Sequence, residues 1–210
     1  MKKLIFAFVT LFLTISLTAQ VKNISERQKF KQFDWEVTAS LALGLSSTSY
    51  ESSSQNYYGN GSGDEEFYSE ISLALGFFII DGLSFEPELD FNFISDAALS
   101  IIANISYTFD IPGKNLYPFF KVGYGKSSYM VHEYGYYEDS EGLFGSLDAD
   151  VINASAGVKI VQSSSMAWRL ELNYKNISST ISPNYFYMEP YDISYNTSVI
   201  SIKIGTSLLF

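Results

Sequence analysis

From Trp35 onward, hydrophobic and polar residues alternate with a period of two along most of the chain. In the first such segment, 35–44, the apolar positions are Trp35, Val37, Ala39, Leu41 and Leu43. This period is typical of a β-strand that has two different faces. The pattern returns at 70–77, 83–93, 99–108, 120–125, 152–160, 168–175 and 200–210. The sequence therefore predicts eight strands.

The connections between these segments alternate in length. They are short after the second, fourth and sixth segments, around 80–82, 110–116 and 162–165. They are long after the first, fifth and seventh segments, at 46–66, 127–149 and 176–195, and only the one near 95–98 is short where a long one is expected. Short turns at one rim and long loops at the other are typical of outer-membrane barrels. We expect an all-β fold, an eight-stranded antiparallel transmembrane β-barrel over 33–210, with both of its ends at the short-turn, periplasmic rim.

The size of the side chains indicates which face points outward. The apolar face consists mostly of Leu, Ile, Val and aromatic residues, whereas the other face carries Gly, Ala, Ser, Thr, Asn and scattered charges. A soluble, lipocalin-like barrel would turn its apolar face inward. The interior of eight strands is only just wide enough for side chains to fill, and this apolar set would overfill it. We therefore expect the apolar face to meet lipid.

Charged residues of the strands fall on the polar face, where we expect them inside the barrel. Six are acidic and five are basic: Glu36, Glu70, Glu86, Glu88, Asp90, Glu171, Lys121, Lys159, Arg169, Lys175 and Lys203. Charges in a narrow lumen must be paired to be tolerable, although a solvated sheet face would also carry mixed charges. The sequence predicts an ion-pair network that plugs the polar lumen.

Two further features concern the barrel wall. Aromatic residues near strand ends suit the interfacial girdles of a membrane barrel; they are Trp35, Phe67, Tyr107, Phe109, Tyr117, Trp168 and Tyr174. Pro87 lies within the third predicted strand, where it lacks a backbone donor, so we expect a local bulge or kink there.

Residues 1–20 have the pattern of a signal peptide. Lys2 and Lys3 precede a mostly apolar stretch from Leu4 to Leu17, and small or polar residues follow up to Gln20. We expect cleavage near Ala19 or Gln20 and a polar periplasmic tail at 21–32. The formal net charge of −10 argues against nucleic acid as a partner, and the absence of Cys excludes disulfides and thiolate metal sites.

The last residues and several strand segments resemble a known group. Lys203, Gly205, Leu208 and the terminal Phe210 resemble the sorting signal that the barrel-assembly machinery reads, although that signal prefers an aromatic residue where Leu208 stands. The segments 85–89, 117–125 and 169–174 are similar to small outer-membrane barrel proteins of the OmpA/OmpX type, the outer-membrane protein β-barrel domain group. The resemblance covers 33–210 and implies the architecture; the group's members have many different roles.

Candidate chemistry is sparse. His132, the single histidine, lies in a predicted long loop without a second His or a recognisable nucleophile spacing. Some barrels of this size modify lipid A, and that enzyme remains a remote alternative; our expectation is no catalytic residue, no cofactor and no metal. Acidic residues in the loops match no calcium-loop spacing that would assign a site. Tyr with Ser, Gly and Asn in the same loops is a composition suited to recognition.

Two functional hypotheses remain. The first is a non-enzymatic barrel whose extracellular loops contact the cell surface or stabilise the envelope, with outer-membrane lipids, lipopolysaccharide or an unknown extracellular ligand as partners. The second is a narrow, porin-like channel for small solutes. Conductance of the purified barrel separates the two.

Overall fold

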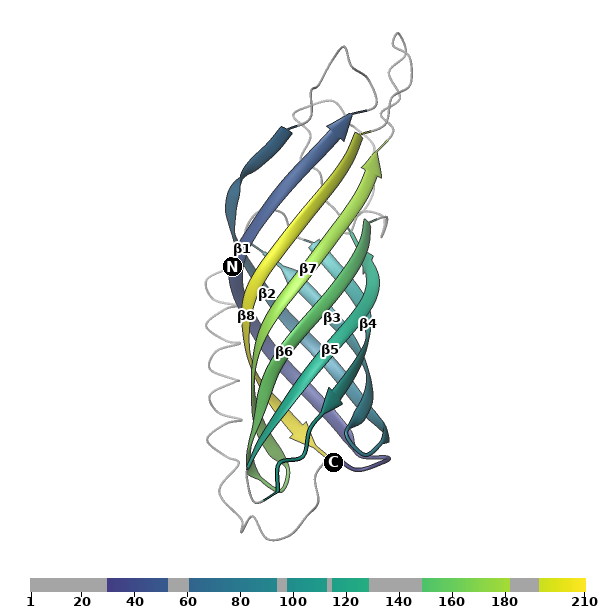
Figure 1. The fold of residues 1–210 in the computed structure, drawn as a ribbon, viewed down its shortest axis with the longest axis vertical. Coiled ribbons are helices and arrows are strands. Elements are labelled where there is room, and N and C mark those ends of the chain that lie inside the picture. The colour runs from purple at the N-terminus through teal and green to yellow at the C-terminus, as the bar shows by residue number, and fades with distance from the viewer. Residues whose placement is uncertain (1–29, 53–60, 94–97, 113–114, 129–148, 182–192) are drawn as a thin grey trace.

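A computed structural model describes residues 30–52, 61–93, 98–112, 115–128, 149–181 and 193–210. These residues form a closed antiparallel β-barrel, which confirms the predicted fold class (Figure 1). Its strands are β1 (Trp35–Ser52), β2 (Gly61–Ile80), β3 (Leu83–Asn92), β4 (Ala98–Thr108), β5 (Leu116–Ser127), β6 (Ala149–Ser163), β7 (Met166–Ile181) and β8 (Ile193–Leu209). Within the described ranges, no helix has the length and apolar character to cross a membrane.

The barrel is closed by its first and last strands. The β1–β8 register runs without a break from Glu36↔Leu209 to Ser52↔Ile193. At the end of this seam, Trp35 N donates to Phe210 O over 3.2 Å and Phe210 N donates to Trp35 O over 3.0 Å. The β2–β3 turn lies at the same rim, where Gly82 takes a positive φ of 79° that a side chain would strain. The two ends of the barrel and its short turns therefore share one rim, as predicted.

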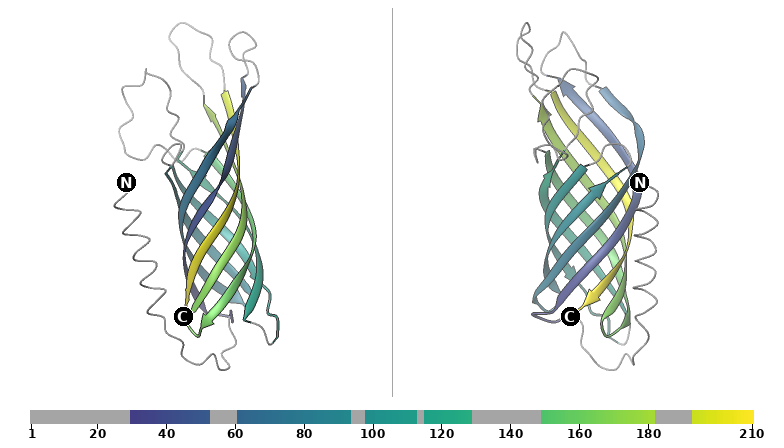
Figure 2. Two further views of the ribbon diagram at one scale, coloured as in Figure 1. Left: turned by 90° about the vertical axis from the view of Figure 1, so that its left-hand side faces the viewer. Right: turned by 180° about the vertical axis from the view of Figure 1, so that it is seen from behind.

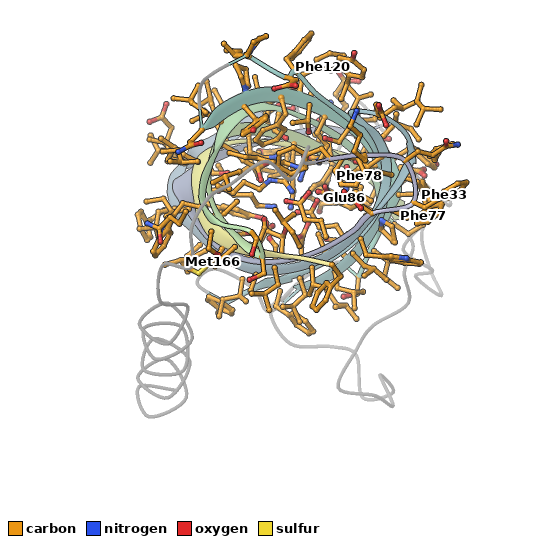
Figure 3. All side chains as sticks on the ribbon, turned by 90° about the horizontal axis from the view of Figure 1, so that it is seen from below. Phe33, Phe77, Phe78, Glu86, Phe120 and Met166 are labelled. Atoms are coloured by element: carbon orange, nitrogen blue, oxygen red, sulfur yellow. The ribbon has the colours of Figure 1, made fainter. Side chains whose placement is uncertain are left out.

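The two faces of the wall are those that the alternation predicts. Large apolar side chains of every strand point outward; Leu172 and Ile200, for example, are each 60% exposed. Seen along the barrel, Phe77 and Phe120 lie outside the ring of strands, whereas Phe78 and Glu86 lie within it (Figure 3). A continuous belt of exposed apolar side chains is unfavourable in water and favourable against lipid. The belt is therefore a membrane-facing surface.

The strands differ in how far they continue beyond this belt. β1, β2, β7 and β8 rise well above β3, β4 and β5 and form a tall wall on one side (Figures 1 and 2). The connections predicted at 46–66 and 176–195 are therefore shorter than expected, because much of each range is strand. The segments between the strands are only 53–60 and 182–192. The reason is that the apolar signal stops at the edge of the belt, whereas the hydrogen-bonded ladder continues through Ser, Thr and Asn.

Two expectations about single residues were wrong. The register of β3 with β4 is continuous through Pro87↔Ala103, and its register with β2 is the same before and after Pro87, so the wall has no bulge there; the proline only interrupts the β2–β3 ladder, which has no pair between Ala74↔Glu88 and Phe77↔Phe85. Tyr117 is not part of the outward girdle, because its side chain is buried inside the barrel. It immediately precedes Pro118, and the alternation at this end of β5 places Tyr117 and Phe119 on the inner face.

Candidate functional site

The inner face of the barrel carries a dense group of charges. All eleven charged residues that the sequence placed on the polar face lie here, and none exposes more than 2% of its surface. They come from seven of the strands, with three acids on β3 and three charged residues on β7. Burial of this degree requires each charge to find a partner inside the barrel. The contacts divide them into two groups.

The lower group, nearer the periplasmic rim, is balanced. It consists of Glu36, Glu86, Glu171, Lys121, Lys159 and Arg169. The Arg169 guanidinium donates two parallel bonds to Glu86, of 2.9 and 3.0 Å, and its Nε lies 2.6 Å from Glu171 Oε1. Lys159 Nζ lies 2.5 Å from Glu36 Oε2, and Lys121 Nζ is 3.4 Å from both Glu86 and Glu171. Three cations thus face three carboxylates, with Arg169 in the bidentate geometry that gives the strongest pairs.

The upper group contains more acids than bases. It consists of Glu70, Glu88, Asp90, Lys175 and Lys203. Lys175 Nζ lies 2.5 Å from both Glu70 Oε2 and Asp90 Oδ2. Lys203 Nζ lies 3.0 Å from Glu70 and 3.6 Å from Asp90, and it donates to Glu88. Lys121 connects the groups by a 2.8 Å contact with Glu88, so the ion pairs form one network across the lumen.

A chain of neutral polar side chains extends this network. Asn104 donates to Glu88 Oε2 over 2.8 Å, Asn153 donates to Asn104 over 2.9 Å, and Asn173 donates to Asn153 over 2.6 Å. A Cβ at Gly123 would collide with the Asn104 side chain, so this glycine makes room for the chain. The sequence placed these Asn residues on the polar face, but did not identify them as part of a site. In the sequence, the only indication of this role was that these Asn residues occupy inward positions close to the predicted charges.

An aromatic cluster fills the periplasmic end of the lumen. Phe30 is only 4% exposed and packs with Phe78, Tyr117, Val161 and Ala167. The Phe30 ring centroid lies 5.5 Å from that of Phe78 and 5.0 Å from that of Tyr117. The cluster touches the ion pairs, because Lys159 Nζ lies 4.8 Å from the Phe30 centroid, a distance suited to a cation–π contact. We call Phe30 and its neighbours the aromatic stopper.

The segment that carries Phe30 is bound to the β2–β3 turn. Gly82 N donates to Phe30 O over 2.8 Å, and Gln32 N donates to Asp81 Oδ1 over 2.9 Å. Lys31 Nζ lies 2.8 Å from Asp81 Oδ2, and its hydrogen bond, together with the one from Gln32, lowers the pKa of the Asp81 carboxyl. Residues 30–32, which the sequence placed in a polar tail, therefore form a strap across the periplasmic mouth. A lone Phe in a polar segment gave no signal of this role.

Of the four residues of the predicted assembly signal, only one belongs to the ion-pair network. Lys203 belongs to the upper group, Gly205 is buried, Leu208 is half-buried beside β1, and Phe210 is 62% exposed on the outside. Their role as an assembly signal stays a prediction. The signal peptide 1–20, most of the tail 21–32 and the loop with His132 lie outside the described residues.

The solved structures that are similar to this chain include three outer-membrane proteins. OprG of Pseudomonas aeruginosa is 12% identical with a TM-score of 0.57, and the match covers 88% of this chain and 99% of that one. Neisserial surface protein A is 15% identical over 83% and 96% of the two chains, with a TM-score of 0.45. AlkL is 12% identical over 91% and 96%, with a TM-score of 0.48.

No family model matches the sequence, and none of the curated proteins does so either. The similarity to OprG extends over nearly the whole of both chains, but at an identity that carries the fold alone. With the closed eight-stranded wall and its outward apolar belt, the chain has the fold of the small outer-membrane β-barrels.

Proposed function

We propose that this chain is a non-enzymatic outer-membrane protein whose lumen is plugged and which acts through its extracellular surface. The observation that carries the proposal is the ion-pair network, in which eleven buried charges from opposite walls contact one another across the lumen. A diffusive pore needs a continuous column of water. Side chains that meet in the middle of the barrel occupy the space that this water would need.

Two successive layers support the closed lumen. The charged network fills the centre, and the aromatic stopper fills the periplasmic end, where Phe30, Phe78 and Tyr117 pack against one another. The stopper is apolar and excludes ions, whereas the network is polar and pairs most of its charges with one another. Each layer closes the lumen without the other. This favours a structural or surface role over the narrow channel that is the second hypothesis.

The extracellular side offers the surface for that role. Above the apolar belt, the outward faces of β1, β7 and β8 carry Ser, Thr and Asn in place of Leu and Ile. A polar cleft of about 510 Å³ lies here, lined by Ser49, Glu51, Asp150, Ser178, Ser179, Thr180, Ser194, Tyr195 and Asn196. Hydroxyl, amide and carboxylate groups suit the sugars and bridged phosphates of lipopolysaccharide, which we propose as a partner together with the surrounding lipids. An extracellular ligand, unidentified in class, would bind to the loops.

Conductance of the purified barrel tests the plugged lumen. In planar bilayers, the wild-type protein is expected to give no stable single-channel current. Phe30→Ala and Arg169→Ala each weaken one layer and are expected to leave the bilayer tight, whereas the combination should raise the leak of small ions. Empty bilayers and Phe33→Ala, which alters an exposed neighbour of Phe30, serve as controls. Large, stable currents from the wild-type barrel would support the porin-like channel instead.

Loop replacement tests the surface role. Short turns in place of 53–60, 129–148 and 182–192 should leave the barrel folded, as measured by its resistance to unfolding in detergent before heating. Binding to lipopolysaccharide micelles, or the resistance of the outer membrane to detergent, should decrease. An unchanged envelope and unchanged binding with all three replacements would contradict a role for these loops. A lipid A profile that changes with expression of the wild type but not of His132→Ala would support the remote enzymatic alternative.

A further inference from the structure

Among the residues that the structure describes, the upper group of the network has one positive charge too few. The lower group has three cations for three carboxylates, but the upper group has only Lys175 and Lys203 for Glu70, Glu88 and Asp90. The eleven charges together leave one excess negative charge inside the barrel. The surrounding wall faces lipid, so counter-ions from the membrane cannot compensate it. An uncompensated buried charge is costly, and the imbalance requires one additional positive charge.

The three carboxylates are close enough to share that charge. One oxygen from each of Glu70, Glu88 and Asp90 lies within 4.8 Å of one oxygen of the other two. Each of the three residues exposes 2% of its surface or less. Carboxylates held this close do not all remain ionised without compensation, because like charges at short range destabilise one another.

The donors around each carboxylate differ, and they single out Asp90. Glu70 accepts hydrogen bonds from Tyr68, Ser72 and Lys175 and also contacts Lys203. Each oxygen of that carboxylate therefore has a donor. The anionic form of Glu70 is well stabilised by charge and by hydrogen bonds.

Glu88 is equally well supplied, but Asp90 is not. Glu88 accepts from Asn104, Lys121 and Lys203. Asp90 has one short contact, from Lys175 to Oδ2, whereas its Oδ1 is buried without a hydrogen-bond partner among the described residues and lies 3.6 Å from Lys203 Nζ. Oδ1 is thus the oxygen of the three carboxyl groups that a proton would satisfy best, since the protonated form gains a donor.

We infer that the carboxylate triad of Glu70, Glu88 and Asp90 holds one exchangeable proton, carried by Asp90. The proton comes from solvent when the barrel folds, forms an O–H bond at the Asp90 carboxyl and returns to solvent when the pH rises. Loss of the proton leaves an unpaired negative charge beside Glu70 and Glu88. The inference goes beyond the proposed function, and it holds whether or not the barrel conducts.

The functional consequence is a barrel whose stability responds to acidity. The folded state binds one more proton than the unfolded state over the range in which the Asp90 carboxyl is protonated only in the barrel. By linkage, the unfolding equilibrium constant increases with pH over that range, by about tenfold per pH unit for one proton. The titratable and charged groups that face Asp90 are Glu70 and Tyr68 on β2, Glu88 on β3, Lys175 on β7 and Lys203 on β8.

Asp90→Asn tests the inference, because the amide has the shape of the protonated acid without its charge. Unfolding by urea in lipid vesicles is measured between about pH 3 and about pH 9, a range that begins below the ordinary pKa of an aspartate, for the wild type, Asp90→Asn and Glu65→Gln. Glu65→Gln is the matched control, since it removes an exposed acid of β2 above the apolar belt. We expect the unfolding equilibrium constants of the wild type and the control to rise together as the pH rises. For Asp90→Asn, this rise should be smaller by about tenfold per pH unit over the range in which Asp90 is protonated only in the barrel. Parallel profiles for all three proteins would overturn the inference.

Infrared spectroscopy of the wild type gives a second readout that needs no variant. The carbonyl stretch of a protonated carboxyl group should be present in mildly acidic buffer, shift on ¹³C labelling of aspartate, and disappear as the pH rises. Lack of an aspartate-shifted band contradicts the inference. If the band is missing and the stability depends instead on replacing sodium by choline at constant ionic strength, the triad holds a metal cation and not a proton.

Discussion

The aromatic stopper and the charged network close the same lumen by different physical means. In the stopper, Phe30 and Phe78 bury apolar surface, which is a non-directional gain and tolerates small shifts of the rings. In the network, Arg169 must meet two carboxylates at fixed positions, because charges buried without partners are costly. The stopper therefore seals the periplasmic mouth of the lumen, whereas the network fixes which residues of opposite strands contact each other across the lumen. The difference predicts how each region responds to substitution.

The largest effect is expected for Arg169→Met. This change keeps much of the side-chain volume but leaves Glu86 and Glu171 without their closest cation in the buried lumen. Removing one partner of a buried pair costs about 3–5 kcal/mol. We expect the free energy of unfolding in vesicles to fall by that amount, as measured by urea titration with Trp fluorescence. A loss no larger than that of an exposed substitution would show that the network contributes little to stability.

The pair Lys159–Glu36 sharpens the comparison, because both charges can be removed together. Lys159→Met alone leaves Arg169, at 3.9 Å, as the remaining cation beside the fully buried Glu36 carboxylate among the described residues, and we expect a loss of about 3 kcal/mol. The double variant with Glu36→Leu removes the unpaired charge, so it should be more stable than the single variant. A double-mutant cycle measures this coupling. If the double variant is less stable than both singles, the pair does not behave as a buried ion pair.

Phe30→Ala tests the apolar region, because it removes one buried ring from the aromatic stopper. The loss of a buried ring at the open end of the barrel should cost about 2–3 kcal/mol, at or just below the lower end of the range for fully enclosed phenylalanines. Phe33→Ala is the matched control, because Phe33 belongs to the same segment but is 67% exposed. A thiol placed at Ala167, which is buried in the stopper, should become reactive toward an added maleimide in the Phe30 variant. Equal effects of the two Phe substitutions would mean that Phe30 does not seal the mouth.

The smallest effect concerns the ion pair that binds the strap. The folded-state pKa of Asp81 lies below its ordinary value because Lys31 and the Gln32 N–H donate to the carboxylate. The contribution of Asp81 is therefore present at neutral pH and is lost as the pH falls through its folded-state pKa. Both partners are exposed, so the effect should be slight and should weaken with added salt. The protection of the Gly82 amide against hydrogen exchange, relative to its intrinsic rate at each pH, should decrease in acid for the wild type and should be low at all pH values for Asp81→Asn.

The sequence predicts the strands and their faces because lipid and a narrow lumen impose opposite demands on alternating residues. Leu41 and Leu43 face lipid, and Ala42 between them is completely buried. The same rule places the charged residues inside, since Glu88 and Lys121 could not face the membrane. Ile102, which interrupts the apolar alternation, is also buried inside.

The individual pairs could not be predicted. Arg169 and Glu86 lie on strands that are not neighbours, and which side chains meet across the lumen depends on the tilt and stagger of the whole barrel. The strap was missed for a different reason, because Phe30 lies outside any periodic segment. The extension of the strands above the apolar belt was not predicted, because the outward residues there are polar and their composition resembles that of a loop.

The unequal height of the wall gives the molecule a front and a back within the plane of the membrane. On the side of β3 and β4, the described strands end near the edge of the lipid, and on the side of β1 and β8 a polar sheet continues beyond it (Figure 2). Seven residues of β1 beyond Leu45 correspond to roughly 20 Å of extended chain. A neighbouring protein that diffuses toward one flank meets a low rim, and toward the other a raised polar screen. The described part of the barrel therefore differs between its two flanks in the plane of the membrane, and the surface that a neighbour meets depends on the flank that it approaches.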